Sequence, residues 1–310
     1  MFKDKKKIIK FLIKSVVSLG FVAWLVASTN WSDVFQLIGK VNPRYVFLYV
    51  VLLVLGILVS SYKWKSLSVY KGVSAPLAVF FKYYLAGIFV NNFMPSFIGG
   101  DAFKAYSLGR PEGKYKESSS AVIVDRITGL VGALMLALVF ATLNRSVFAS
   151  SEILTAVYFS ILSAFLAFVF YLFARKMRLW GMIKEKFPPK VGEYLSILNS
   201  YADAKILSLS LVYSVFFSLV GIALANYVLF MSFGVRMGVV DYLSVIFLIS
   251  IVSSIPVSIN NIGIKEWAYV TFFGIFGIPG ATVVAVAILS RFIQMIVSFF
   301  ALPVYLKGRK

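Results

Sequence analysis

The 310-residue chain contains neither cysteine nor histidine. Without cysteine it can form no disulfide and offers no thiolate nucleophile. Without histidine it lacks the commonest metal ligand and the side chain that most readily exchanges protons near neutral pH. Any proton transfer must therefore use carboxylates, and the sequence predicts neither a metal site nor a cofactor.

Acidic residues are also scarce. Charged residues make up 14% of the chain, and 12 Asp and Glu stand against 31 Lys and Arg, for a net charge of +19. Hydrophobic residues make up 60%, whereas soluble domains are close to half apolar and about a quarter charged. The composition predicts a multi-pass protein of the plasma membrane with no sizeable soluble domain. Its positive charge then indicates anionic membrane lipids as partners rather than nucleic acid. Nothing in the sequence predicts an oligomeric state.

Long apolar runs define the expected spans, since a helix needs about 20 residues to cross the hydrocarbon core. Six runs approach or exceed this length, at approximately residues 8–28, 45–62, 121–143, 153–174, 207–233 and 281–306. Two more apolar segments, 76–108 and 242–278, are interrupted by Pro, Gly and Asn. Non-helical backbone persists at membrane depth only inside protein or along a wet cavity. We therefore expect an all-α polytopic membrane protein with about six full spans and two re-entrant hairpins of broken helices.

The distribution of basic residues predicts the orientation. If both interrupted segments turn back, 22 of the 31 Lys and Arg residues lie on the cytoplasmic side with both termini. Segments 8–143 and 153–306 then have the same order of spans in opposite orientation. The chain, 1–310, is predicted to be one membrane domain built as an inverted-topology repeat, with a short external loop between the halves. Double crossings of both segments would give the same side assignments.

A basic cytoplasmic loop is expected at residues 175–206. Its second part, continuing to about residue 209, has an amphipathic pattern, with Leu195, Leu198, Ala202 and Ile206 roughly on one face. It forms either a helix on the inner membrane surface or a solvated basic loop.

Charged residues remain within the apolar segments, where each costs about 3 kcal/mol at the centre of a helix. Such residues face protein or a cavity and usually pair. Asp125 and Arg126 are neighbours, so they point about 100° apart on a helix and need partners elsewhere, such as Lys104 or Lys265 for Asp125.

Charges also follow each helix break. Asp101 comes after two glycines, and we expect it to be the N-cap of a half-helix whose free N–H groups suit phosphate. Lys104, one turn further on, adds positive charge to the same place. Lys265 and Glu266 occupy the equivalent position in the second break, although a shallow hairpin would leave both in water.

Basic residues outnumber acidic ones in these segments, which predicts an anionic, phosphate-bearing ligand, and in a membrane this indicates a lipid. The predicted substrate-binding residues are Lys104, Arg126, Lys265, Arg291, Asn92 and Asn260. The predicted coupling or orienting residues are Asp101, Asp125 and Glu266, and the predicted hinge residues are Pro95, Gly99, Gly100, Pro256 and Gly263. We expect a flippase, and no catalytic residue. The alternatives are a lipid-modifying transferase or phosphatase, and a transporter of small solutes or ions.

Three motifs resemble the membrane domain of lysylphosphatidylglycerol synthases and the wider flippase-like, YbhN-like family. They are Asn92, Pro95, Gly99-Gly100-Asp101 and Lys104; then Asp125-Arg126 and Gly129; then Pro256, Ser258, Asn260, Gly263 and Lys265-Glu266. The resemblance covers nearly the whole chain and implies movement of a lipid between leaflets. Aminoacyl transfer is not implied, because that reaction belongs to a separate soluble domain. Lys104 and Lys265 stand where many relatives have Arg, and Asn261 stands where Gly is common.

Overall fold

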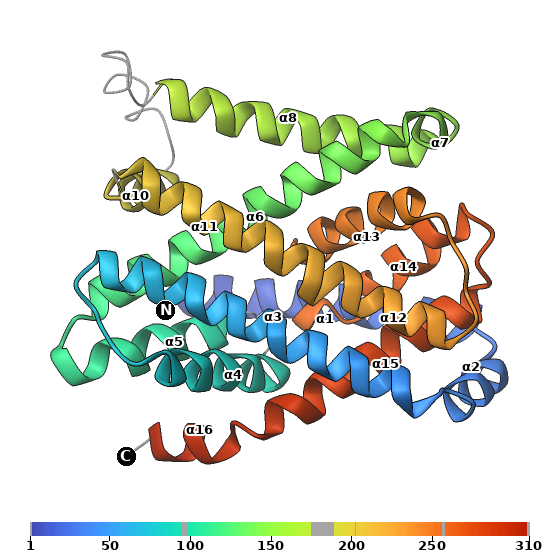
Figure 1. The fold of residues 1–310 in the computed structure, drawn as a ribbon, viewed down its shortest axis with the longest axis horizontal. Helices are drawn as coiled ribbons and strands as arrows, with labels where there is room; N and C mark the ends of the chain where they lie inside the picture. The colour runs from blue at the N-terminus through green and yellow to red at the C-terminus, as the bar shows by residue number, and fades with distance from the viewer. Residues whose placement is uncertain (1, 95–97, 175–188, 202, 256–257, 309–310) are drawn as a thin grey trace.

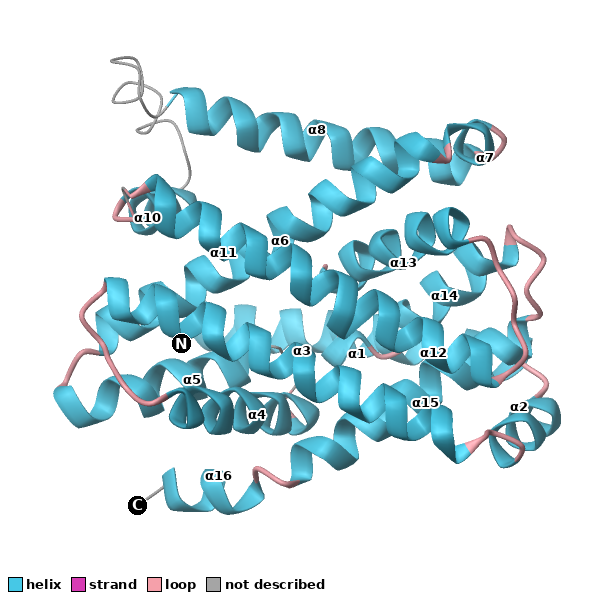
Figure 2. Ribbon diagram, viewed as in Figure 1, coloured by secondary structure: helices cyan, strands magenta, loops and turns pink. Residues whose placement is uncertain are grey.

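The computed structural model describes residues 2–94, 98–174, 189–201, 203–255 and 258–308. Every regular element in these ranges is a helix (Figure 1; Figure 2). Together with the apolar spans below, this confirms the prediction of an all-α polytopic membrane protein.

Five helical spans among the described residues are long and apolar enough to cross a membrane. They are α3 (Pro43–Tyr70), α6 (Tyr115–Leu143), α8 (Glu152–Ala174), the continuous helix Ala204–Ser232 and α15 (Gly280–Phe299). A sixth results if α1 (Phe2–Ser28) and α2 (Trp31–Gly39), which are bent by 82° at the break between them, form one span. These spans match the predicted runs, but α3 and α6 each extend several residues beyond the continuous apolar stretch.

The two interrupted segments each form a pair of shorter helices. The first pair is α4 (Leu77–Phe93) and α5 (Ile98–Gly109), and the second is α13 (Val239–Ser254) and α14 (Ile264–Gly274). The remaining short elements are η1 (Arg110–Glu112), α7 (Arg145–Ala149), α10 (Pro189–Asn199), η3 (Ile259–Asn261) and α16 (Leu302–Gly308).

Helices α4 and α5 fold back on one another as an antiparallel hairpin. The side-chain oxygen of Asn91 accepts the N–H of Gly100 at 2.8 Å, and further from the tip Gly87 lies against Lys104. A Cβ atom on Gly100 would collide with the carbonyl oxygen of Gly87. Glycine is therefore required where the two backbones touch.

The second arm of this hairpin begins earlier than the sequence predicts. Helix α5 starts at Ile98, so Asp101 lies inside the first turn and the predicted N-cap role of Asp101 is wrong. Gly99 and Gly100 are likewise helical. The physical reason is that Asn91, on the opposite arm, already supplies an acceptor for a free N–H of this helix end.

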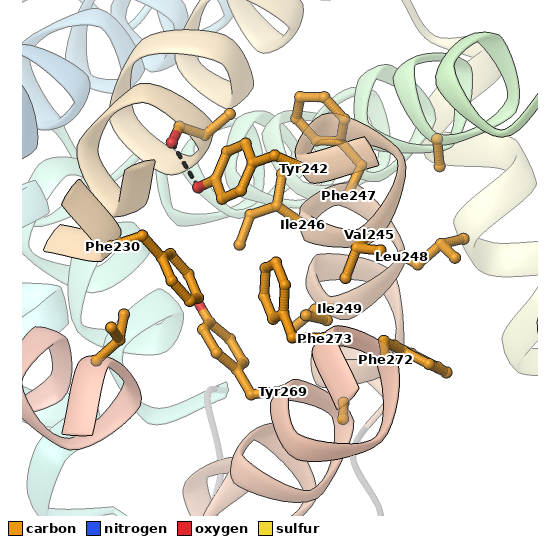
Figure 3. Packing of buried hydrophobic residues seen from close by; sticks show 14 of the residues in the cluster. Phe230, Tyr242, Val245, Ile246, Phe247, Leu248, Ile249, Tyr269, Phe272 and Phe273 are labelled. Atoms are coloured by element: carbon orange, nitrogen blue, oxygen red, sulfur yellow. Dashed lines mark hydrogen bonds between the residues drawn. The ribbon is translucent and has the colours of Figure 1, made fainter. Parts of the chain in front are cut away.

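The second hairpin holds the largest apolar core. Val245, Ile249 and Phe272 are buried between its arms and the neighbouring helices, and the rings of Tyr242 and Phe273 stack with centroids 6.0 Å apart. Figure 3 shows Tyr242 of α13 and Phe273 of α14 pointing into the same space between the two helices, with Ile249 beside Phe273. Tyr242 lies near the start of α13 and Phe273 near the end of α14, so these arms are also antiparallel.

The helix Ala204–Ser232 changes its winding at its centre. Between α11 (Ala204–Phe217) and α12 (Ala225–Ser232) it contains a π-helical segment, η2 (Ser218–Leu224). Helix α3 crosses this segment (Figure 1). A Cβ atom on Gly56 would lie 2.8 Å from the Cα of Gly221, so neither glycine leaves room for a side chain.

Two elements differ from the predicted runs. Helix α2 is additional; it is capped by Asn30, which accepts the N–H of Ser32 at 3.2 Å, and it buries Val34 against α15. The predicted run 281–306 is divided into α15 and α16. Pro303, in the first turn of α16, cannot donate the N–H that a continuous helix requires there.

The amphipathic segment predicted to continue to about residue 209 is divided: it forms α10 and, from Ala204, the start of α11, which Asp203 caps. Leu198 of α10 is buried, and Leu195 packs beside it against a cluster that contains Trp64 and Tyr201. The apolar face thus lies on the protein itself, while residues 175–188 and 202 are outside the described ranges. Re-entry of the hairpins, the inverted repeat, the domain limits and the cytoplasmic termini remain predictions.

Candidate functional site

The charged residues of α3, α5 and α6 form one buried group. Asp125 lies on α6, and its carboxylate is 3.0 Å from the ammonium of Lys63 and 3.9 Å from that of Lys104. The side chains of Lys63 and Asp125 are only 6% and 4% exposed. Lys104 is one of the two partners that the sequence predicts for Asp125.

Lys63 belongs to this group, although it comes directly after the predicted apolar run 45–62. Helix α3 continues to Tyr70, so Lys63 lies within the helix and inside the bundle. The ammonium also donates to the carbonyl of Asp125 at 2.8 Å and to the hydroxyl of Ser214 at 3.2 Å. A usable signal was present in the sequence, since Trp64 and Leu67 continue an apolar face beyond Lys63.

Asp101 connects this group to Arg126. One carboxylate oxygen is 3.1 Å from the ammonium of Lys104, one turn along α5. The other oxygen forms an ion pair with the guanidinium of Arg126. Asp125 and Arg126 therefore have different partners, as their divergent directions on the helix predict. The ammonium of Lys104 also lies 4.4 Å from the ring centre of Tyr84, a cation–π contact.

A second group of charges joins α14 to α15. Arg291 donates to one carboxylate oxygen of Glu266 at 2.9 and 3.2 Å, and the other oxygen accepts the N–H of Gly263 at 2.7 Å. Glu266 thus fixes both the start of α14 and the guanidinium of Arg291. Lys265 forms no salt bridge within the described part of the chain, and its ammonium lies 5.6 Å from the ring centre of Tyr269.

Backbone conformation at the second break explains two of the predicted positions. Gly263 has φ +85°, and a Cβ atom there would collide with Phe21 of α1, so only glycine fits. Asn261 has φ 55°, a left-handed conformation that asparagine tolerates better than most residues. This is the position where the resemblance indicates a common Gly.

Two adjoining cavities bring the predicted charges together. The first, of about 430 Å³, is lined by Lys63, Asp101, Lys104, Asp125 and Arg126 among others. The second, of about 450 Å³, is lined by Arg126, Lys265, Arg291, Asn92 and Asn226 among others. The cavities share Tyr84, Ile88, Asn91, Arg126, Phe217, Ile222, Ser250 and Ser254. Arg126 is thus the charged residue on the wall between them.

The remaining predicted residues have different positions. Asn92 donates its amide to the hydroxyl of Ser298 at 2.7 Å and so joins α4 to α15. Asn260 belongs to η3, and its side chain is outside the description. Pro95 and Pro256 also lie outside the described residues.

The chemistry available at these cavities is ionic recognition. Five cations, Lys63, Lys104, Arg126, Lys265 and Arg291, stand against three carboxylates, Asp101, Asp125 and Glu266. Across the described residues, no three Asp or Glu side chains are placed to hold a metal ion together. A surplus of positive charge enclosed by helices favours the binding of an anion.

Two comparisons relate the chain to known proteins. Over 317 aligned positions it is 26% identical to the UPF0104 membrane protein MJ1595 of Methanocaldococcus jannaschii, with 94% of this chain and 93% of that relative covered. The profile of the family described as "Lysylphosphatidylglycerol synthase TM region" matches residues 11–301. The chain therefore belongs to the family of the lysylphosphatidylglycerol synthase transmembrane region.

Proposed function

We propose that this protein is a flippase that moves an anionic, phosphate-bearing lipid between the leaflets of the plasma membrane. The observation that carries the proposal is the surplus of positive charge on two adjoining cavities inside the helix bundle. The family is the membrane domain of lysylphosphatidylglycerol synthase-like proteins, which supports a lipid-related role.

The cations differ in how fully protein carboxylates neutralise them. Lys63 and Lys104 are buried against Asp125 and Asp101. Arg126 is paired with Asp101, yet 49% of its side chain is exposed. In this proposal Arg126 and Lys265 hold the phosphate, with Lys104, Arg291, Asn92 and Asn260 around it. Asp101, Asp125 and Glu266 orient these bases.

Alternating access in the proposal comes from movement of one half of an inverted repeat against the other. The helix contacts support such a repeat. The last span of the first half, α6, packs on the hairpin helix α13 of the second half, and α15 packs on α4 of the first half. Of the predicted hinges, Gly99 and Gly100 lie at the start of α5 and Gly263 lies at the start of α14.

Reconstitution into liposomes tests this function against its alternatives. The wild-type protein should accelerate the exchange of a fluorescent phosphatidylglycerol between leaflets, and Arg126→Ala should abolish that exchange without loss of folded protein. The same vesicles should pass no radiolabelled phosphate, which a small-solute transporter would pass, and should leave the lipid chemically unchanged, which a lipid-modifying enzyme would not. Wild-type exchange in Arg126→Ala would remove Arg126 from the site.

A further inference from the structure

A third cavity lies on the outer side of the ion pair between Asp101 and Arg126. It has a volume of about 350 Å³ and lies between α5, α6 and α10. Ala102 and Ala105 of α5 and Val122 and Ile123 of α6 form apolar walls. The charged pair stands at one end, so the cavity is amphipathic.

This cavity opens to the outer surface of the helix bundle. Ala102, Ser119 and Tyr194 are exposed on its lining, with Tyr194 of α10 at 52%. A groove between α6 and α10 continues from it, because Ser119 and Ile123 also line a neighbouring cavity of about 520 Å³. The third cavity is therefore accessible from the outer surface of the bundle.

The inner end of the same cavity adjoins the proposed transport site. Asp101, Arg126 and Ile127 line both the third cavity and the first inner cavity, and Arg126 lines the second inner cavity as well. The ion pair thus stands between the outer cavity and the two inner ones. An anion that moves inward from the outer cavity must compete with the Asp101 carboxylate for the Arg126 guanidinium.

We propose that the third cavity is a lateral binding site for an anionic phospholipid and that the Asp101–Arg126 pair separates it from the inner cavities. The phosphate binds Arg126, whose planar guanidinium matches phosphate geometry. The glycerol and first methylenes lie against Ala102, Ala105, Val122 and Ile123, and the remaining acyl chains stay in the bilayer. Free phosphate would make no use of these apolar walls. The inference rests on the proposed function, in which this lipid is the transported one.

Site-directed fluorescence quenching tests the binding site without any translocation. The chain has no cysteine, so Ser119→Cys can carry a single bimane label in otherwise unmodified full-length protein. Brominated phosphatidylglycerol should quench this label at about tenfold lower mole fraction than brominated diacylglycerol, which has the same acyl chains but no phosphate; this is the ratio that one charge-assisted hydrogen bond provides. The matched control is Val139→Cys, which is 53% exposed on the same helix and lines none of the described cavities. Its label should be quenched equally by both lipids.

Three variants identify the groups involved. Arg126→Gln should remove the preference for the anionic lipid. Ala102→Trp, at an exposed position, should remove it by filling the cavity, and it serves if Arg126→Gln does not fold. Asp101→Asn should strengthen the preference, because it removes the carboxylate that competes with phosphate; a purely structural role for Asp101 predicts no such gain.

Equal quenching by the two lipids at Ser119→Cys, or the same preference at Val139→Cys, would overturn the lateral site. The two proposals can fail separately. A preference at Ser119→Cys in protein that exchanges no lipid rejects the flippase function and supports the binding site. Lipid exchange without any preference rejects the binding site and leaves the function standing.

Discussion

Lys63 and Lys265 illustrate two environments for a cation among membrane helices. Lys63 contacts the carboxylate and the carbonyl of Asp125 and the hydroxyl of Ser214, so protein groups surround its ammonium. Lys265 lines a cavity and is near the ring of Tyr269. The first arrangement holds three helices together, whereas the second leaves a cation available to a ligand.

We expect Lys63→Met to destabilise the protein. The substitution leaves the Asp125 carboxylate buried with only Lys104 at 3.9 Å, and breaking a buried ion pair costs on the order of 3 kcal/mol. Thermal unfolding of the purified protein in detergent measures the loss. Lys65→Met, two residues further along α3, is the matched control and should change the melting temperature little. Equal shifts in the two variants would show that the Lys63 pair does not stabilise the fold.

Individual residues show which contacts of the site could be predicted from the sequence. The need of Asp125 and Arg126 for separate partners follows from helix geometry, and Lys104 was identifiable as one partner. Lys63 was missed because a lysine after an apolar run looks like the end of a span, although Trp64 and Leu67 beyond it indicated that the helix continues. The left-handed backbone at Asn261 requires coordinates, although the Gly expected there by resemblance indicates it.

At the scale of elements, the crossing of α3 and η2 brings two backbones into direct contact. Gly56 and Gly221 meet there backbone to backbone, and Phe217, Gly221 and Ile222 beside the crossing line the second inner cavity. A π-helical turn inside an α-helix often occurs at a functional position. This crossing therefore connects the packing of the two halves to the shape of the site.

Gly221→Ala should lower the free energy of unfolding by about 1–3 kcal/mol, the usual cost of inserting a methyl group where no space exists. Gly20→Ala in α1 is the control, since a Cβ atom there has no neighbour within 4 Å. Both substitutions add the same methyl group to a helix, so chemical denaturation in the same detergent isolates the crossing. If the Gly221→Ala protein is as stable as the Gly20→Ala protein, α3 and η2 can move apart without lowering the free energy of unfolding, and the close contact does not stabilise the fold.

Element boundaries were less predictable than element existence. The apolar runs indicated every long span, and Pro, Gly and Asn indicated both breaks. The start of α5 was misplaced because its free N–H is satisfied by Asn91 across the hairpin, a contact between chain segments that no local signal encodes. Helix α2 was missed because its nine residues lie in a loop that was read only for its charge.

For the whole molecule, the inverted repeat predicts that the residues flanking the two hairpins face opposite sides of the membrane. Single cysteines in the cysteine-free chain, at Lys71 and Glu112 flanking the first hairpin, should react with a membrane-impermeant maleimide only from the cytoplasm. Cysteines at Arg236 and Ile275, flanking the second hairpin, should react only from outside. These four positions flank the helix pairs rather than filling them, so folding should be retained. Reaction of all four from one side would exclude opposite orientation of the halves.

Parts of the site that lie within one half of the chain could be predicted from the sequence, whereas parts that depend on how the helices pack could not. The charges after the two breaks were recognisable as related, and the carboxylate after each break, Asp101 or Glu266, pairs with an arginine of the span that follows it, α6 or α15. The position of Arg126 between two cavities could not be predicted, because it depends on how α6 packs against helices of both halves. The lateral cavity depends in the same way on α10, whose apolar face was expected to lie on a membrane or in water.

Native mass spectrometry of the purified protein tests the central claim most directly, since the account requires the inner cavities to bind an anionic phospholipid. Wild-type protein should retain such a lipid in excess over its share of the membrane extract. Lys265→Met should reduce that retention about tenfold, equivalent to 1.4 kcal/mol, with an unchanged melting temperature. Bound lipid with the headgroup composition of the bulk membrane, unaltered by Lys265→Met, would contradict the account.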